Sequence, residues 1–183
     1  MQKIVKTPNL IITPSDENDL WEKDWNVTLR KGEKNQIGTV SFAGEKEYGT
    51  IPIQLHIQPE YQNKGYGTDV LRAMVDWAFS FGNIYEVTAE TTHTNDRCVH
   101  ALNKARFVLR EGDRFREFYS IKKQKTSWTG LYLFIGITIG MILTLVFDDP
   151  KVGMGIGILV SLFIGGSLDI GEKKNREKVT GKK

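Results

Sequence analysis

A short glycine-containing segment, Gln62-Asn-Lys-Gly-Tyr-Gly-Thr68, has the residue types and spacing that most clearly suggest chemistry. It follows an alternating apolar segment at residues 50–58 and precedes apolar residues at helical spacing over residues 68–81. A strand, a glycine turn and a helix start present free backbone N–H groups and a positive helix end to an anion. Glycine at positions 65 and 67 also lets the backbone approach an oxygen-rich group, such as a pyrophosphate, without interference from Cβ.

The same residues and the composition exclude several other classes of site. The third spaced glycine of a dinucleotide-binding motif and the Gly-Lys-Ser/Thr of a phosphate-binding loop are both missing from this segment. Residues 1–121 carry 15 Lys and Arg against 17 Asp and Glu, a formal charge of −2, which argues against nucleic acid as a partner. The single cysteine, Cys98, excludes an internal disulfide and a cysteine-rich metal site, so no metal is expected.

The elements that must position the glycine turn predict a mixed α/β fold. Strands are predicted at residues 9–13, 25–30, 36–42, 50–58, 84–90, 107–110 and 115–121. Helices are predicted at residues 68–81 and 95–105. Helix-start residues at Ser15 and Asp16 predict a further short helix after the first strand. Turns at residues 31–35 and 43–49 complete this order.

The glycine segment resembles the Gln/Arg-x-x-Gly-x-Gly/Ala signature of the GNAT superfamily of N-acetyltransferases. Asn95 followed by a helix ending in Phe107 is similar to the branch of ribosomal-protein and spermidine N-acetyltransferases, and the resemblance covers about residues 8–121. It implies a GNAT-like acyl-CoA N-acyltransferase fold, acetyl-CoA as co-substrate and a primary amine as acceptor. The residues it implies for coenzyme binding are Leu55, His56, Ile57, Gln58, Gln62, Asn63, Lys64, Gly65, Tyr66, Gly67, Thr68 and Asn95.

An amine acceptor must lose a proton before or during attack, so a general base is expected. Glu90 is the first candidate, because it ends a predicted strand five residues before Asn95, as the resemblance implies for a catalytic glutamate. His56 is the second candidate, because histidine titrates near neutrality. In a strand, however, His56 shares a face with Gln54 and Gln58 rather than with the apolar residues beside it.

The chain departs from the family pattern in three places. Leu102 stands where the family often has a tyrosine that protonates the leaving thiolate, and Arg106 stands where a glycine is usual. Relatives usually insert two helices between the first strand and the following hairpin, whereas only residues 15–24 lie there in this chain. We therefore expect a more open acceptor groove, and either an enzyme without the standard acid, another group in its place, or a loss of catalysis.

The last third of the chain has a different composition. Residues 129–147 are 19 residues without a charge, long enough to cross a membrane core of about 30 Å with little to spare, and residues 152–168 are 17 more uncharged residues. Basic residues precede and follow this pair, while an acidic turn at Asp148 and Asp149 separates the two segments. The positive-inside rule then predicts a multi-pass protein of the cell membrane with its N-terminal domain and C-terminal tail in the cytoplasm.

The predicted organisation is a GNAT-like domain at residues 1–121, a basic linker at 122–128, a transmembrane hairpin at 129–168 and a basic tail at 169–183. Small residues recur every four positions within the hairpin, at Gly136, Gly140, Gly153, Gly157, Ser161 and Gly165. Such spacing lets helices pack closely in lipid. It is compatible with packing inside one hairpin and with a homo-oligomer.

Three functions are compatible with these features. The leading one is a membrane-tethered N-acetyltransferase that modifies a protein N-terminus, a lysine, a polyamine or a similar amine. The alternative is a non-catalytic acyl-CoA-binding sensor or recruitment module, which Leu102 favours. In the third, the hairpin is the main functional part and the domain is a relic.

Overall fold

The computed structural model describes residues 4–31, 35–42, 49–124 and 127–180, and the chain divides into two units, Met1–Lys123 and Gln124–Lys183. Most of the predicted turns at 31–35 and 43–49 lies outside the described residues, as do parts of the predicted linker and tail. Each unit is described by itself below.

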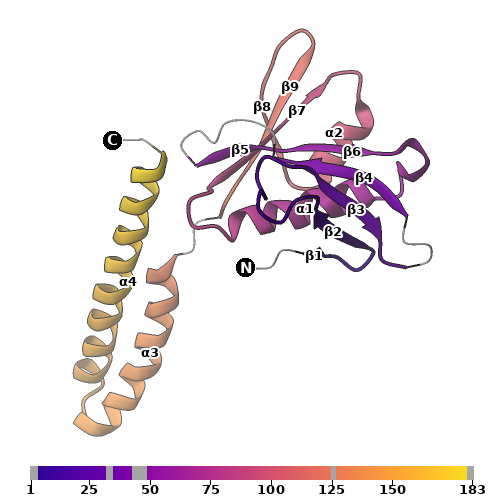
Figure 1. Ribbon diagram of the computed structural model, residues 1–183. Helices are drawn as coiled ribbons and strands as arrows, with labels where there is room; N and C mark the ends of the chain where they lie inside the picture. The colour runs from indigo at the N-terminus through magenta and orange to yellow at the C-terminus, as the bar shows by residue number, and fades with distance from the viewer. Residues whose placement is uncertain (1–3, 32–34, 43–48, 125–126, 181–183) are drawn as a thin grey trace. The chain divides into compact units, whose positions relative to one another are not determined.

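The first unit contains two sheets (Figure 1). The antiparallel sheet has the order β1-β2-β3-β4-β6, and its strands are Val5–Lys6, Leu10–Pro14, Trp25–Leu29, Gln36–Ser41 and Gln54–Ile57. The mixed sheet has the order β5-β7-β9-β8, and its strands are Thr50–Pro52, Glu86–Thr92, Arg116–Lys122 and Val108–Gly112. The mixed α/β class predicted from the sequence is confirmed.

The strand predicted at residues 50–58 is broken at Ile53, and this break creates the opening of the site. Before it, β5 pairs in parallel with β7, and the Ile53 amide donates to the Thr88 carbonyl at 2.7 Å. After it, β6 pairs antiparallel with β4 instead. One continuous segment therefore joins both sheets, and β6 diverges from β7.

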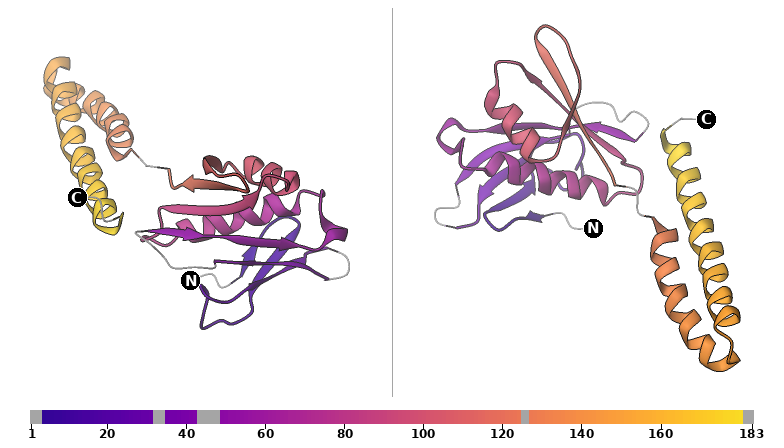
Figure 2. Two further views of the ribbon diagram at one scale, coloured as in Figure 1. Left: turned by 90° about the horizontal axis from the view of Figure 1, so that it is seen from above. Right: turned by 180° about the vertical axis from the view of Figure 1, so that it is seen from behind.

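Helix α1, Tyr66–Phe79, follows a single 3₁₀ turn at Pro59–Tyr61, and α2 spans Asp96–Lys104. Five apolar residues of α1 recur at helical spacing and are buried: Val70, Leu71, Met74, Val75 and Ala78. They join a core that includes Trp25, Phe42, Ile84 and Leu102. The views of Figure 2 show α1 and α2 side by side.

The short helix predicted after the first strand is absent, because residues 15–24 form a series of turns. Side chains take the place of a helical hydrogen-bond ladder: Asp16 accepts from the Asn18 amide at 2.9 Å and Asp19 from the Glu22 amide at 3.0 Å. The Ser15 amide donates to the Asp24 carbonyl and closes the segment as a loop. The two-residue strand β1 was not predicted from the sequence.

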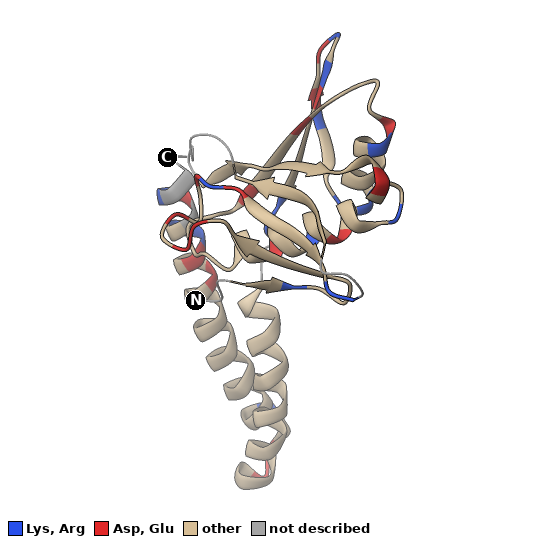
Figure 3. Ribbon diagram, turned by 45° about the vertical axis from the view of Figure 1, so that its right-hand side comes forward, with Lys and Arg blue, Asp and Glu red and all other residues tan. Residues whose placement is uncertain are grey.

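The second unit is a pair of helices, α3 at Trp128–Phe147 and α4 at Pro150–Thr180. Both are long and apolar enough to cross a membrane by length and composition, with mean hydropathies of 2.3 and 1.7 over the spans Trp128–Phe147 and Pro150–Asn175. Charged residues are confined to the ends of the pair (Figure 3). Helix α4 continues beyond the predicted apolar segment, where Lys173 and Glu177 form an i,i+4 ion pair at 3.8 Å.

Candidate functional site

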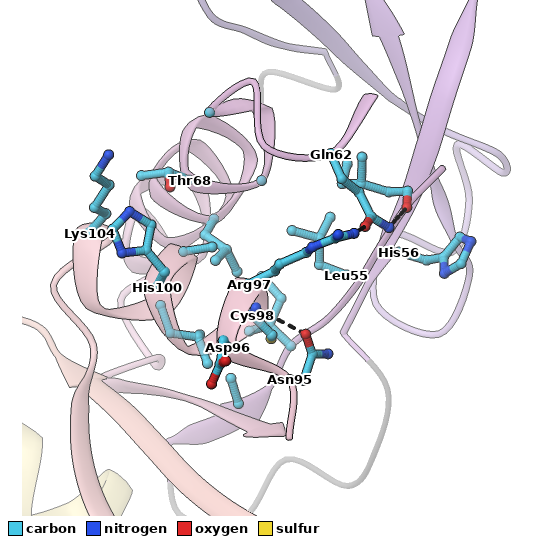
Figure 4. A pocket seen from close by; sticks show the side chains of 18 of the residues that line it. Leu55, His56, Gln62, Thr68, Asn95, Asp96, Arg97, Cys98, His100 and Lys104 are labelled. Atoms are coloured by element: carbon cyan, nitrogen blue, oxygen red, sulfur yellow. Dashed lines mark hydrogen bonds between the residues drawn. The ribbon is translucent and has the colours of Figure 1, made fainter. Parts of the chain in front are cut away.

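A pocket of about 770 Å³ lies where β6 diverges from β7 (Figure 4). The start of α1 and residues along the whole of α2 also line it. Its lining includes most of the residues predicted for coenzyme binding: Leu55, His56, Ile57, Gln62, Asn63, Gly65, Gly67, Thr68 and Asn95. Glu90, Cys98 and Leu102 line it as well. Gln58, Lys64 and Tyr66, which were also predicted, are not among the lining residues.

The start of α1 has the form of an anion site. Gly65 is its N-cap in a left-handed conformation, with φ of 84°, and provides no side-chain cap. Because the first intrahelical bond is donated by Asp69, the amides of Tyr66, Gly67 and Thr68 are left for another acceptor. Their dipoles add a partial positive charge at this end of the helix.

The glycine at position 67 is explained by a ligand better than by packing. A Cβ there would lie 3.7 Å from a Leu55 methyl and 3.8 Å from the Ala101 Cβ, which are ordinary contacts. Leu55 and Ala101 both line the pocket, so that Cβ would occupy pocket space. The cradle thus fits an oxygen-rich phosphate group that approaches the backbone closely.

Of residues 55–58, which were all predicted to bind the coenzyme, only some have backbone groups that point toward the pocket. The Gln58 amide donates to the Ile37 carbonyl at 2.9 Å, so this residue turns its backbone toward β4. Backbone groups alternate along a strand, so those of His56 point the same way, and those of Leu55 and Ile57 point toward the pocket. The Ile57 carbonyl already accepts from the Gln62 side chain at 2.8 Å.

The two candidate bases differ in their placement. Glu90 is exposed on β7 at the pocket, and one of its carboxylate oxygens accepts from Arg116 at 2.8 Å. The imidazole of His56 is exposed and points away from the other labelled side chains of the pocket (Figure 4). The geometry therefore favours Glu90 over His56.

Asn95 is the N-cap of α2, since its side-chain oxygen accepts from the Cys98 amide at 3.2 Å. Its amide NH₂ group remains able to donate to a ligand. Leu102, at the position where the family often has a tyrosine, is 1% exposed and contributes only apolar surface to the pocket.

Arg97 is a pocket residue that was not predicted. It extends from α2 across the pocket and donates to the Gln62 side-chain oxygen at 2.8 Å (Figure 4). The sequence signal for it was present, because Arg97 lies two residues after Asn95 in the helix predicted at residues 95–105. What the sequence could not show was that this helix lies opposite Gln62.

A polar cluster next to α2 contains two residues, His93 and Tyr119, whose pKa values are shifted by their neighbours. The Nε2 atom of His93 lies 2.7 Å from the Asp113 carbonyl and its Nδ1 atom 2.8 Å from the Glu117 carboxylate. Both partners are acceptors, so the ring must donate from both nitrogens, which raises the pKa of His93 above 6.5. Burial and the contact with Glu117 raise the pKa of Tyr119.

Comparison with known proteins gives three results. The model of the acetyltransferase (GNAT) domain matches residues 8–108. Spermidine N(1)-acetyltransferase of Escherichia coli K12 is 32% identical over 67 residues, 37% of this chain and 36% of that protein. The corresponding enzyme of Vibrio cholerae is 29% identical over 93 residues, 50% of this chain and 53% of that protein, so the chain spans about a third to a half of these relatives.

Solved structures agree in fold. A GNAT-family acetyltransferase from Bacillus anthracis superposes with a TM-score of 0.57 at 16% identity, covering 65% of this chain and 98% of that one. The ribosomal-protein-S5-alanine acetyltransferase of Vibrio fischeri gives a TM-score of 0.51 at 20% identity, covering 60% and 65%. At such identities the likeness concerns the fold.

Proposed function

Because the chain belongs to the GNAT acetyltransferase family, whose members use acetyl-CoA, we propose that it is an N-acetyltransferase that acts on a primary amine at a membrane. The observation that carries this proposal is the pocket in which the glycine turn, the free edge of β6, Asn95 and Glu90 meet. Acetyl-CoA supplies the activated acetyl group when bound there.

The chain's own groups have distinct roles in this proposal. The amides at the start of α1 bind the pyrophosphate. The backbone of Leu55 and Ile57 pairs with the pantetheine arm, and an N–H of this strand donates to the acetyl oxygen, where negative charge develops during attack. Asn95 orients the arm with its amide NH₂ while its oxygen caps α2.

Glu90 acts as the general base, directly or through a water molecule. Arg116 contacts one of its two carboxylate oxygens, so the other oxygen can accept the proton of the attacking amine. The amine then attacks the acetyl carbon, and the coenzyme leaves as a thiol or thiolate.

The acceptor is a primary amine that reaches the pocket from an open side. The relatives named for spermidine and for a ribosomal protein support a polyamine or a protein amine. The loop at residues 15–24 replaces the helices that relatives usually insert, which leaves more room for a large acceptor. Spermidine and an N-terminal peptide are therefore the first acceptors to assay.

The membrane location rests on α3 and α4. A buried core helix would also be apolar, but these helices expose large apolar side chains: Phe134 is 75% exposed, Leu145 84% and Phe163 79%. Basic flanks and an acidic turn support a cytoplasmic position for both chain ends. Tethering raises the local concentration of the domain near membrane-associated acceptors.

A non-catalytic acyl-CoA-binding module is the second candidate. The observation in its favour is Leu102, which gives the pocket an apolar surface where the family often has a phenolic acid. A coenzyme thiol with a pKa of about 8.5, by analogy with cysteine, can leave without full protonation, so Leu102 does not by itself prevent turnover.

The test uses the full chain in nanodiscs, with acetyl-CoA binding and thiol release measured on spermidine and on an N-terminal peptide. We expect turnover with at least one of them, and a decrease of about 10²–10⁴ in kcat for Glu90→Gln. Glu86→Gln is the matched control, because Glu86 lies on the same strand and forms an ion pair with Lys122 at 3.6 Å. Binding without turnover on any amine would favour the sensor, and unchanged turnover in Glu90→Gln would exclude Glu90 as the base.

A further inference from the structure

Two cationic residues and a histidine of α2 line the pocket on one side. Arg97, His100 and Lys104 are spaced by three and four residues, which places them on one face of the helix, and all three are exposed. Figure 4 shows His100 and Lys104 beside Thr68, near the first turn of α1, whereas Asn95 lies at the other end of the pocket. Lys104 is nine positions after Asn95, which corresponds to a helical rise of about 13.5 Å.

The three residues do not have the same surroundings. Arg97 already donates to Gln62, which belongs to the glycine turn, so it lies at the level of the pyrophosphate cradle. His100 and Lys104 lie further along α2, away from Asn95. They form a second basic position beyond the cradle, at the end of the pocket opposite Asn95.

Lys104 is well placed to hold a compact anion. The helix end that carries it is held by α1, because the Arg72 guanidinium donates to the Lys104 carbonyl. A lysine in the last turn could serve only to complement the helix dipole. That role does not require the residue to line the pocket, nor a histidine one turn before it on the same face.

Coenzyme A carries negative charge at two places, the pyrophosphate and the phosphate monoester on the 3′ oxygen of its ribose. A phosphate monoester carries a charge of about −1.5 to −2 near pH 7, so a lysine and a histidine beside it give direct electrostatic recognition. The amides of α1 account for the first anion, and the second basic position has the right charge for the other.

We propose that His100 and Lys104 form a subsite for the 3′-phosphate, which makes the protein selective for coenzyme A over 3′-dephospho-coenzyme A. This inference rests on the proposed function, because it assumes that the coenzyme occupies the pocket. It adds a specificity that the glycine turn cannot provide, since both ligands have the same pyrophosphate.

The experiment compares the affinities of coenzyme A and 3′-dephospho-coenzyme A for the full chain in nanodiscs by calorimetry. We expect the wild-type protein to bind coenzyme A at least about tenfold more tightly. In the double variant His100→Gln/Lys104→Gln, the affinity for coenzyme A should fall to that for the dephospho form, which should itself be unchanged. Lys104→Arg should keep most of the selectivity, and Lys31→Gln, an exposed lysine outside the pocket lining, should keep all of it.

The outcomes separate the two proposals. Equal wild-type affinities for the two ligands would overturn the 3′-phosphate subsite and leave the proposed function standing. Failure of the wild-type protein to bind either ligand would instead overturn the proposed function. Selectivity that persists in the double variant would show that other residues recognise the 3′-phosphate. The wild-type comparison needs no variant, so equal affinities overturn the subsite even if a substitution affects folding, while the assignment to His100 and Lys104 is tested by the double variant, with Lys104→Arg as the check that the fold tolerates a change there.

Discussion

The two glycine-rich regions of this molecule use the same residue for opposite purposes. At the start of α1, a Cβ on the N-cap Gly65 would meet no atom within 4 Å among the described residues, and one on Gly67, in the first turn, would make only ordinary contacts. In the hairpin, a Cβ on Gly136, Gly153 or Gly157 would collide with the backbone of the facing helix. The glycines at the start of α1 keep space open for a ligand, whereas those of the hairpin let the backbones of two helices come into contact.

The comparison also resolves an ambiguity about the hairpin. The small-residue spacing was compatible with packing inside one chain or between chains. The structure places these residues between α3 and α4, with Gly140 against Gly153 and Met154, and Gly165 against Thr129. This face of the hairpin is therefore occupied within the chain.

The largest effect is expected for Gly67→Val. The added side chain would occupy the pocket between Leu55 and Ala101, and we expect acetyl-CoA to bind roughly 100-fold more weakly, a loss of about 2.7 kcal/mol. The thermal midpoint should change little, because the pocket offers room. Gly82→Val is the control, since a Cβ there meets nothing within 4 Å among the described residues and Gly82 lies outside the pocket lining. Unchanged affinity in Gly67→Val would contradict the claim that Gly67 keeps space open for the coenzyme.

The next effect is expected for Gly157→Ala. Its Cβ would run into the backbone of Gly136 and Gly140, so the packing of α3 on α4 should weaken by about 1–3 kcal/mol. Detergent-induced separation of the helices, followed by energy transfer between dyes at positions 127 and 171, measures this change. Gly155→Ala, on the same helix but facing no atom within 4 Å among the described residues, should be neutral. Equal behaviour of the two variants would contradict the assigned packing face.

A smaller effect is expected for Asp169→Asn. This α4 carboxylate accepts from the Trp128 amide at 2.9 Å and from the Thr129 amide at 3.2 Å and hydroxyl at 2.6 Å, so it caps α3 from the neighbouring helix. Loss of its charge should destabilise the hairpin by about 1 kcal/mol in the same detergent assay. Glu177→Gln, which removes an exposed i,i+4 pair, should cost no more than about 0.5 kcal/mol. If Asp169→Asn has no larger effect than this control, the cross-helix cap does not stabilise the pair.

The smallest effect is expected for His93→Gln, and it depends on pH. Because the folded-state pKa of His93 is raised above 6.5, its contribution to stability is complete below pH 6.5 and is lost as the pH rises through the raised value. The difference in thermal midpoint between the wild type and the variant should thus shrink with increasing pH. A difference that stays constant across this range would show that the contacts with Asp113 and Glu117 do not require the protonated ring.

Much of the architecture could be predicted because its signals are local. The apolar spacing of α1, the glycine turn and the two uncharged segments each depend on residues close in sequence, and the mixed α/β fold and the GNAT family are confirmed. The prediction of a short helix after the first strand was wrong, because the side chains of Asp16 and Asp19 accept hydrogen bonds from backbone amides in turns. The roles of Glu90, Asn95 and the cradle residues stay predictions until they are assayed.

What the sequence determined by itself is which residues can bind an anion, which segments are apolar, and where a helix can start. The tertiary structure alone decided how these parts meet. The break at Ile53 depends on pairing with Thr88, the reach of Arg97 depends on Gln62, 35 residues away, and Asp169 caps a helix that begins 41 residues before it. Such contacts depend on which strands and helices become neighbours, and that choice is made by the packing of the whole core rather than by local propensity.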